Sequence, residues 1–304
     1  MNIHRILAAT DMSMCATHAE TRAAMLCHAL QVSEIALMTV IDFSLPGALE
    51  RLLNNAQAFS EASLAEHAER DLQRIASRLQ SEYNVVCNCS VEFGRPASRI
   101  ASKADEISAD LVVAGEHGCN SVSDAFLGNT PYKLLHVGRH PLLIVKNQPE
   151  RAYESILVPV DFSDNSMLAA QTALAISPTA SVTLLHGFEA LHEGLMNYAG
   201  VSRDFIRGYR TEAKDNAMKE MDRFLSDLDK GGRPVASSVQ FGYPPLVIQE
   251  HAETFKPDLI VIGKHGKSRL EDFLLGSVTR HTIEETYCDI LVTLPPKAST
   301  LPSF

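Results

Sequence analysis

Short apolar segments alternate with longer amphipathic segments along the chain. Between residues 205 and 228, apolar side chains recur every three or four positions, which predicts one face of a long helix. A similar periodicity over residues 62–79 predicts the corresponding helix in the first half. The short apolar runs of the second half that we interpret as buried strands span residues 156–160, 181–186, 235–241, 259–262 and 290–294. This alternation predicts a parallel sheet with helices on both faces.

The two halves of the chain repeat each other. The segment RILAATDMS of the first half returns as SILVPVDFS 150 positions later, and DLVVAGEHG returns as DLIVIGKHG 148 positions later. Matches in the same order and at a nearly constant offset indicate the duplication of one domain. The polar, proline-containing stretch at residues 147–151 marks the junction. We therefore predict one domain over residues 1–149 and a second over residues 150–304.

The composition narrows the class of protein. The chain has 27 Lys and Arg against 37 Asp and Glu, a net charge of −10, which is the wrong sign for a general nucleic-acid binder. No apolar run approaches the roughly 18 residues of a membrane span, and the beginning of the chain lacks the pattern of a signal peptide. The six cysteines are irregularly spaced. We therefore expect a soluble, cytoplasmic protein with reduced thiols and neither nucleic-acid nor membrane partners.

The loop after the fourth strand of the second half carries candidate chemistry. From Gly263 to Ser277 the spacing is Gly-x2-Gly-x9-Gly-Ser. Glycines permit positive φ and the close approach of a ligand, and a helix beginning at Ser277 presents free N–H groups that suit a phosphate. Asp161, after the first strand, would face the same crevice and can accept hydrogen bonds from a ribose. Ordinary turn glycines and an N-cap aspartate are the alternative; the combined spacing favours the ligand site.

These motifs resemble those of the universal stress protein family, in its tandem form, over about residues 3–146 and 154–294. The family's nucleotide signature is Gly-x2-Gly-x9-Gly-Ser/Thr after the fourth strand, and the Asp-Phe-Ser ending of the first strand strengthens the likeness. The resemblance implies two tandem Rossmann-like (adenine-nucleotide α-hydrolase-like) domains, each a five-stranded parallel sheet of order 3-2-1-4-5 with helices on both faces. It also implies ATP or ADP as ligand, with or without Mg²⁺.

The resemblance assigns roles to individual residues. In family members that bind ATP, the first-strand Asp holds the ribose, backbone near the end of the second strand contacts the adenine, and the glycine loop with its following Ser holds the phosphates. Gly187 stands where the family usually has Val, so we expect reduced packing against the adenine and unchanged main-chain recognition. The site residues implied in the second domain are Pro159, Val160, Asp161, Gly187, Gly263, His265, Gly266, Gly276, Ser277, Val278 and Thr279.

The first domain departs from the motif. Asn129 replaces the Ser or Thr, and Pro131 has no N–H to offer a phosphate. Its loop, residues 115–129, has two acids and no base, a charge of −2, whereas residues 263–277 have three bases and two acids, a charge of +1. We therefore expect nucleotide mainly in the second domain; drifting surface charge and Pro131 as a favourable helix start are the alternative. The corresponding weaker site residues are Asp11, Val40, Gly115, Gly118, Gly128 and Asn129.

Other reactive side chains have structural interpretations. Cys87 and Cys89 share one face of a predicted strand, where we expect buried, inert thiols; zinc ligation is the alternative. His186, after the second strand, fits a hydrogen-bonded structural histidine, and His117 and His265 fit loop hydrogen bonds beside the phosphate site. Apolar side chains after the second strand favour the core of the long helix over a lid: Met196, Tyr198, Phe205 and Tyr209.

The leading hypothesis is a cytoplasmic stress-response or regulatory protein that binds ATP or ADP. We expect no catalytic or metal-ligating residues and at most slow hydrolysis, because the sequence shows no positioned base or carboxylate pair. The alternatives are a slow ATP hydrolase or adenylate-forming enzyme, and a nucleotide-free scaffold for protein interaction. The expected partners are the adenine nucleotide and unidentified proteins. The last strands would otherwise be apolar edges, so we expect a pseudo-dimer within the chain; a further homodimer stays open.

Overall fold

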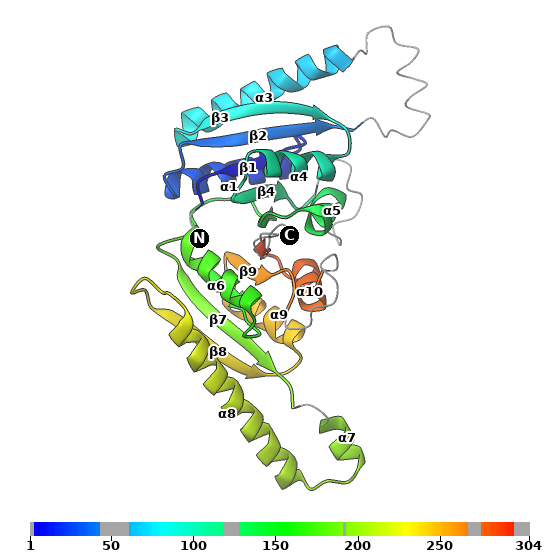
Figure 1. Ribbon diagram of the computed structural model, residues 1–304, viewed down its shortest axis with the longest axis vertical. Helices are drawn as coiled ribbons and strands as arrows, with labels where there is room; N and C mark the ends of the chain where they lie inside the picture. Colours follow the sequence, from blue (N-terminus) through cyan, green and yellow to red (C-terminus); the bar gives the residue numbers. More distant parts are fainter. Residues whose placement is uncertain (1–2, 43–60, 118–127, 191–192, 267–274, 295–304) are drawn as a thin grey trace, which may run out of the picture. The chain divides into compact units, whose positions relative to one another are not determined.

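The structure is a computed structural model in which two compact units can be recognised. Of the residues that the structure describes, one unit comprises those from 3 to 152 and from 289 to 294, and the other comprises those from 153 to 288. The elements of both units are drawn in Figure 1. The structure describes residues 3–42, 61–117, 128–190, 193–266 and 275–294.

The unit with the first copy of the repeat contains a sheet of order β3-β2-β1-β4-β5-β10. Its first five strands are parallel and follow the predicted order 3-2-1-4-5. Every residue of β1, β4 and β5 except Gly115 is buried, which explains why these strands are continuous apolar runs. The strands are β1 (Ile6–Ala9), β2 (Glu34–Ile41), β3 (Val86–Phe93), β4 (Leu111–Gly115), β5 (Leu142–Val145) and β10 (Asp289–Thr293).

Helices cover both faces of this sheet. The helices are α1 (Met14–Ala29), α3 (Glu61–Tyr83), α4 (Pro96–Glu106) and α5 (Asn129–Val137). α1 and α3 contact each other and the sheet, while α4 and α5 contact each other and pack on β2 and β5. This is the three-layer arrangement that the alternation of strands and helices predicted.

β10 is the last strand of the second copy in sequence, yet it pairs with the last strand of the first copy. The pairing with β5 is antiparallel, and Leu291 lies opposite Leu143. These two leucines are equivalent positions of the repeat, because 291 − 143 is the repeat offset of 148. A strand pair centred on equivalent residues fits the predicted pseudo-dimer within the chain.

The second unit repeats the same design. Its parallel strands have the order β9-β6-β7-β8, which corresponds to 4-1-2-3 of one copy. α6 and α8 pack on β6, β7, β8 and β9, and α9 packs on β7 and contacts α10. The two tandem α/β domains of the fold prediction are confirmed. The elements are β6 (Ser155–Pro159), β7 (Ser181–Phe188), β8 (Val235–Phe241), β9 (Leu259–Gly263), α6 (Asp164–Ile176), α7 (Glu193–Tyr198), α8 (Arg203–Asp227), α9 (Pro244–Phe255) and α10 (Ser277–Glu285).

One repeated aspartate has a simple structural role. Oδ2 of Asp110, just before β4, accepts hydrogen bonds from two consecutive backbone N–H groups before β1, at 2.9 and 3.0 Å. Oδ2 of Asp258, just before β9, accepts the same pair of bonds at the start of β6, at 2.9 and 3.0 Å. The carboxylate therefore ties the first strand to the fourth strand in each copy, which explains this part of the repeat motif without any ligand.

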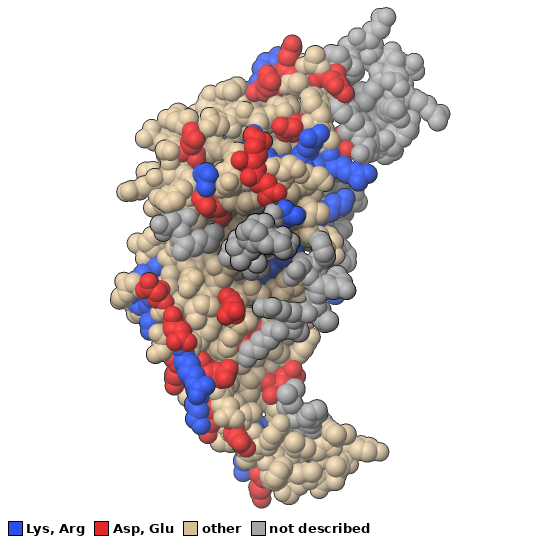
Figure 2. All heavy atoms as spheres, in the orientation of Figure 1, with Lys and Arg blue, Asp and Glu red and all other residues tan. Residues whose placement is uncertain are grey.

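The long helix α8 differs from its predicted packing. Met221 and Phe224 are buried as expected, whereas the side chain of Phe205 is 61% exposed and that of Tyr198, on the unpredicted α7, is 92% exposed. The core interpretation of Phe205 and Tyr198 is therefore wrong. A helix of 25 residues is about 37 Å long, whereas a strand of seven residues spans about 23 Å, so α8 extends past β8. Acidic and basic side chains lie side by side along α8 in Figure 2.

Candidate functional site

The turn after β6 holds the carboxylate of Asp161. Its Oδ1 accepts hydrogen bonds from the backbone N–H of Ser163, at 3.1 Å, and from the Ser163 hydroxyl, at 2.5 Å. Ser163 is the N-cap of α6, and its Oγ also accepts a bond from the Ser166 N–H at 3.3 Å. Oδ1 thus takes part in the turn, and Oδ2 lies beside Gly266 of the glycine loop.

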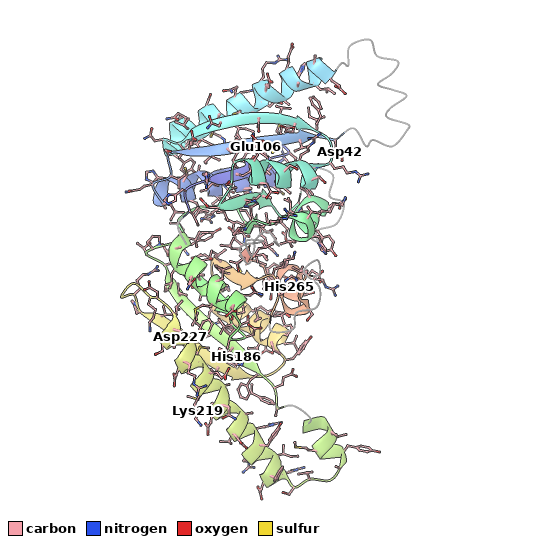
Figure 3. The ribbon with its side chains drawn as sticks, viewed as in Figure 1. Asp42, Glu106, His186, Lys219, Asp227 and His265 are labelled. Carbon is pink, nitrogen blue, oxygen red and sulfur yellow. The ribbon has the colours of Figure 1, made fainter. Side chains whose placement is uncertain are left out.

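The residue between Asp161 and Ser163 has an unusual backbone. Phe162 has a φ of 63°, a left-handed conformation that a bulky residue seldom adopts. Its ring packs against the ring of His186, with centroids 4.2 Å apart, and against the ring of Phe224, at 6.0 Å. His186, labelled in Figure 3, bonds through Nδ1 to the carbonyl oxygen of Val160 at 2.8 Å. The predicted structural role of His186 is confirmed: it supports the strained turn.

The glycine loop closes tightly on this turn. A Cβ atom at Gly266 would lie 2.5 Å from Oδ2 of Asp161, one at Gly263 would lie 3.1 Å from Cβ of Asn165, and one at Gly276 would lie 3.1 Å from a backbone oxygen of the loop. None of the three glycines has φ in the left-handed range, and Gly276 has a φ of −59°. The expectation of positive φ is therefore wrong at these positions, and the glycines are needed for space.

The first turn of α10 offers hydrogen-bond donors at this loop. Gly276 is the N-cap residue and no side chain caps the helix, so the amides of Ser277, Val278 and Thr279 have no acceptor within the helix. Ser277 is exposed. Thr279 is buried, and its hydroxyl donates to the carbonyl oxygen of Gly263 at 2.8 Å. The Thr279 hydroxyl therefore joins α10 to β9, and the other donors at this end of the helix are the backbone amides and the exposed Ser277 hydroxyl.

Asn165, on the first turn of α6, is a site residue that the motif did not reveal. Its Nδ2 donates to the carbonyl oxygen of His265 at 3.0 Å, so it holds the loop that follows β9. Its repeat equivalent in the first copy is Cys15, 150 positions earlier, which has no amide. Comparing the two copies position by position was the only sequence signal for this residue.

The end of β7, where the resemblance predicts the adenine contact, is shaped by α9. A Cβ atom at Gly187 would lie 3.0 Å from Cα of Pro244 and 3.3 Å from Cβ of Val247. α9 therefore occupies the space that a side chain at position 187 would need. Pro159 ends β6 on the neighbouring strand, and the next residue, Val160, is buried.

The first copy keeps the shape of the site. Oδ1 of Asp11 accepts a bond from the Ser13 N–H at 3.1 Å, and Met12 has a φ of 64°, matching the turn after β6. A Cβ atom at Gly115 would lie 3.1 Å from the carbonyl oxygen of Cys15. A Cβ atom at Gly128 would lie 2.6 Å from the carbonyl oxygen of Glu116. Val40 is half-buried on β2. Gly118 lies outside the described residues.

The charges at the two glycine loops differ. The carboxylate of Glu116 lies 2.9 Å from Nζ of Lys146 and 3.5 Å from Nδ1 of His117. The repeat equivalent of Glu116 is Lys264, which is buried, and α5 has the buried Pro131 where α10 has Thr279. The first copy thus has the acidic Glu116 where the second has the basic Lys264, and it has Pro131, which lacks an N–H group, where the second has the N–H donor of Thr279. The other loop charges counted in the sequence lie outside the described residues: Asp124, Lys267, Arg269, Glu271 and Asp272.

A buried polar network supports the turn of the first copy. The Thr10 hydroxyl donates to Glu20 at 2.6 Å and accepts from the Met12 N–H at 2.9 Å, while Arg78 donates to Glu20 at 2.7 Å. Burial raises the pKa of the Glu20 carboxyl, and the bonds from Thr10 and Arg78 oppose that rise. In the second copy, the aromatic cluster of Phe162 supports the turn instead. The sequence did not reveal this difference because Arg78 lies 58 residues from Glu20.

The thiols of β3 are protonated at neutral pH. Cys87 and Cys89 are half-buried, and burial raises the pKa of the Cys87 thiol to about 11 and also raises that of Cys89. The Cys89 sulfur lies 3.8 Å from the carbonyl oxygen of Leu72. Among the described residues, no group of three or more His, Cys, Asp or Glu side chains is arranged to hold a metal ion. The raised pKa values support the inert interpretation of this pair, although burial is only partial.

Fold and site together define a tandem Rossmann-like α/β protein, with an aspartate turn and a glycine loop meeting at the carboxyl ends of the strands. The model of the universal stress protein family matches residues 2–146 and again residues 152–293, and the chain belongs to that family.

Individual relatives resemble one or both copies. Universal stress protein MJ0577 of Methanocaldococcus jannaschii is 28% identical over 152 residues, which cover 46% of this chain and 94% of the relative. Universal stress protein E of Salmonella typhi is 25% identical over 244 residues, which cover 73% of this chain and 74% of the relative. The crystal structure of a universal stress protein from Archaeoglobus fulgidus has a TM-score of 0.69 at 17% identity, covering 97% of this chain and 99% of that one, and shows the same fold.

Within the described parts of the chain, no helix combines enough length with enough apolar character to cross a bilayer.

Proposed function

We propose that the second copy binds ATP or ADP and that this nucleotide is the signal through which the protein acts as a cytoplasmic stress-response or regulatory protein. The observation that carries the proposal is the position of Oδ2 of Asp161 beside Gly266, where an added Cβ atom would lie 2.5 Å from that oxygen, next to the uncapped first turn of α10. A hydrogen-bond acceptor and a set of donors thus meet at one strand edge. Ligands of open α/β sheets bind at this edge.

Each part of the site suits one part of the nucleotide. Oδ2 of Asp161, which lies beside Gly266, accepts hydrogen bonds from the ribose hydroxyls in this proposal. The amides of Ser277 and Val278, at the positive end of the α10 dipole, receive the phosphates. Backbone at Gly187 meets the adenine.

Magnesium fits only as part of the ligand. The described residues form no cluster of three or more metal-ligating side chains. Mg²⁺ usually retains several waters and binds through substrate phosphates, so it would arrive as the magnesium complex of the nucleotide. We propose slow hydrolysis at most.

The first copy binds nucleotide more weakly in this proposal. Glu116 places a carboxylate at the loop, and Pro131 removes a donor from the first turn of α5. Asp11 accepts the same hydrogen bond from its turn as Asp161 does, so the part of the site proposed for the ribose is retained. The part proposed for the phosphates is unfavourable for an anion. We therefore expect one nucleotide per chain.

The test compares the two aspartates by calorimetric titration with ATP and with ADP. Asp161→Ala should weaken binding by about 1.5–3 kcal/mol, the range for hydrogen bonds to a charged group, or about 10- to 150-fold in Kd. Asp11→Ala, the matched control in the other copy, should leave Kd and the stoichiometry of one unchanged. Urea unfolding confirms that both variants fold.

Other results of this titration would favour a different function. Equal losses in the two variants would refute the asymmetry of the copies. No binding by the folded wild-type protein would favour the nucleotide-free scaffold, and rapid release of phosphate would favour the hydrolase. A universal stress protein has been crystallised in complex with cAMP, so cAMP is included as a competitor to define the ligand.

A further inference from the structure

A buried ion pair holds the last strand of the second copy against the first copy. Nε of Arg22, on α1, lies 3.4 Å from Oδ2 of Asp289, the first residue of β10. The two side chains are 8% and 2% exposed. Arg22 also donates to the carbonyl oxygen of Arg151 at 2.8 Å, and all three residues lie in the same unit, that of the first copy.

The carboxylate of Asp289 also positions the neighbouring strand. Its Oδ1 accepts hydrogen bonds from the backbone N–H groups of Lys146, at 2.9 Å, and Asn147, at 3.3 Å, just after β5. A buried carboxylate with two amide donors and an arginine is well compensated, whereas the same carboxylate without the arginine would retain an uncompensated buried charge.

The strand pairing itself does not distinguish one copy from the other. Leu143 lies opposite its own repeat equivalent, Leu291, and the neighbouring pairs are Ile144 with Ile290 and Leu142 with Val292. This register would also suit two first copies or two second copies taken from different chains. Similar apolar residues at these three paired positions make all three pairings acceptable to the sheet.

The ion pair breaks this symmetry. The repeat equivalent of Arg22 is Thr172, and that of Asp289 is Pro141, so neither charge is duplicated in the other copy. Two first copies would bring Arg22 to a proline at both ends of the pairing, and two second copies would bring Asp289 to a threonine at both ends. Only the pairing of a first with a second copy gives each buried charge its partner.

We propose that the edge of β5 with Arg22 is a recognition surface for the last strand of a second copy, and that the Arg22–Asp289 pair excludes like-with-like pairing between chains. Burial of the apolar strands stabilises the association, and the buried ion pair determines which copy is bound. A pair of two first copies or of two second copies would bury two charges of the same sign without their partners. A chain that closes on its own β10 has this surface covered, so an oligomer formed through it must exchange last strands reciprocally.

The test reverses one charge in each of two full-length chains that carry different affinity tags. Arg22→Asp places two acids at the pairing end within its own chain, and Asp289→Arg places two arginines there. When the two chains are co-expressed and exchange last strands, the unchanged Asp289 of one chain meets the unchanged Arg22 of the other. The two substituted side chains, which also have opposite charges, meet each other. We expect them to co-purify in a 1:1 complex of about 67 kDa, twice the 33.3 kDa of one chain, well above the co-purification of two tagged wild-type chains.

Matched controls carry the same charge changes elsewhere. Lys133→Asp and Glu285→Arg alter exposed residues of α5 and α10 and should co-purify no more than wild type. Equal recovery of the Arg22→Asp/Asp289→Arg partners and of these controls would overturn the proposal when the single variants fold.

A second measurement decides the matter if the single variants do not fold. Adding Arg22→Asp to Asp289→Arg in one chain restores an opposite-charge pair, although the two amide bonds of Asp289 are lost. The doubly substituted chain should recover solubility and melt at a higher temperature than Asp289→Arg alone. Equal or lower thermal stability, or no recovery of soluble protein, would refute recognition by charge.

Discussion

Replacing Gly266 by Ala should disable the nucleotide site while changing only one methyl group. The new Cβ would lie 2.5 Å from Oδ2 of Asp161, and this separation must grow by at least 0.5 Å to reach 3.0 Å, the lower limit of real contacts. Oδ1 of the same carboxylate is bound to Ser163, so the shift disturbs a group that is already anchored. The carboxylate would be displaced from its place beside the ribose.

The magnitude follows from the bonds that this displacement removes. Hydrogen bonds to a charged group contribute about 1.5–3 kcal/mol, so Gly266→Ala should raise the Kd for ATP by about 10- to 150-fold. Asp161→Ala removes the same bonds and should have a similar effect. Because both substitutions act through one carboxylate, adding Gly266→Ala to Asp161→Ala should cost almost nothing further.

Isothermal titration of the wild type, the two single variants and the double variant measures this coupling. Gly208→Ala is the matched control, since Gly208 lies within α8 and a Cβ there meets nothing within 4 Å. This control should leave Kd unchanged and stabilise the fold by up to about 1 kcal/mol. Fully additive losses, or an unchanged Kd in folded Gly266→Ala, would show that Oδ2 of Asp161 does not contact the nucleotide.

Two further predictions concern stability and cysteine chemistry. Gly187→Ala would place Cβ 3.0 Å from Cα of Pro244 and should lower the free energy of unfolding by about 1–3 kcal/mol, as in overpacked cores; unchanged urea unfolding would contradict this. Because the Cys87 pKa is raised from 9.0 to about 11, its thiolate fraction at pH 8 should be about 100-fold below the ordinary value, and alkylation by iodoacetamide should accelerate tenfold per pH unit up to about pH 11. Because the thiol ionises less readily in the folded state than in the unfolded state, raising the pH above 9 should also lower the free energy of unfolding. Fast alkylation of Cys87 at pH 8, measured by peptide mass spectrometry, would refute the raised pKa.

Local patterns in the sequence determined the architecture of each copy. Buried parallel strands must be apolar on both faces, and covering helices must show one apolar stripe, so both were visible as short-range periodicity. The duplication made each half an independent check on the other, and the aspartate and glycine spacing marked the strand edge where we propose the nucleotide site. The same short-range reasoning failed for α8, because a periodic stripe does not reveal where the sheet beneath it ends.

The tertiary structure decided what depends on residues far apart in the chain. The glycine loop needs glycine because Asp161 and Asn165 approach it from about 100 positions away, and the sequence alone had suggested backbone conformation as the reason. The pairing of β10 with β5, and of Asp289 with Arg22 across 267 positions, follows from which surfaces meet after the sheets have formed. A residue's own neighbours in sequence set its secondary structure, but its partners in space determine whether its charge is buried, paired or available to a ligand.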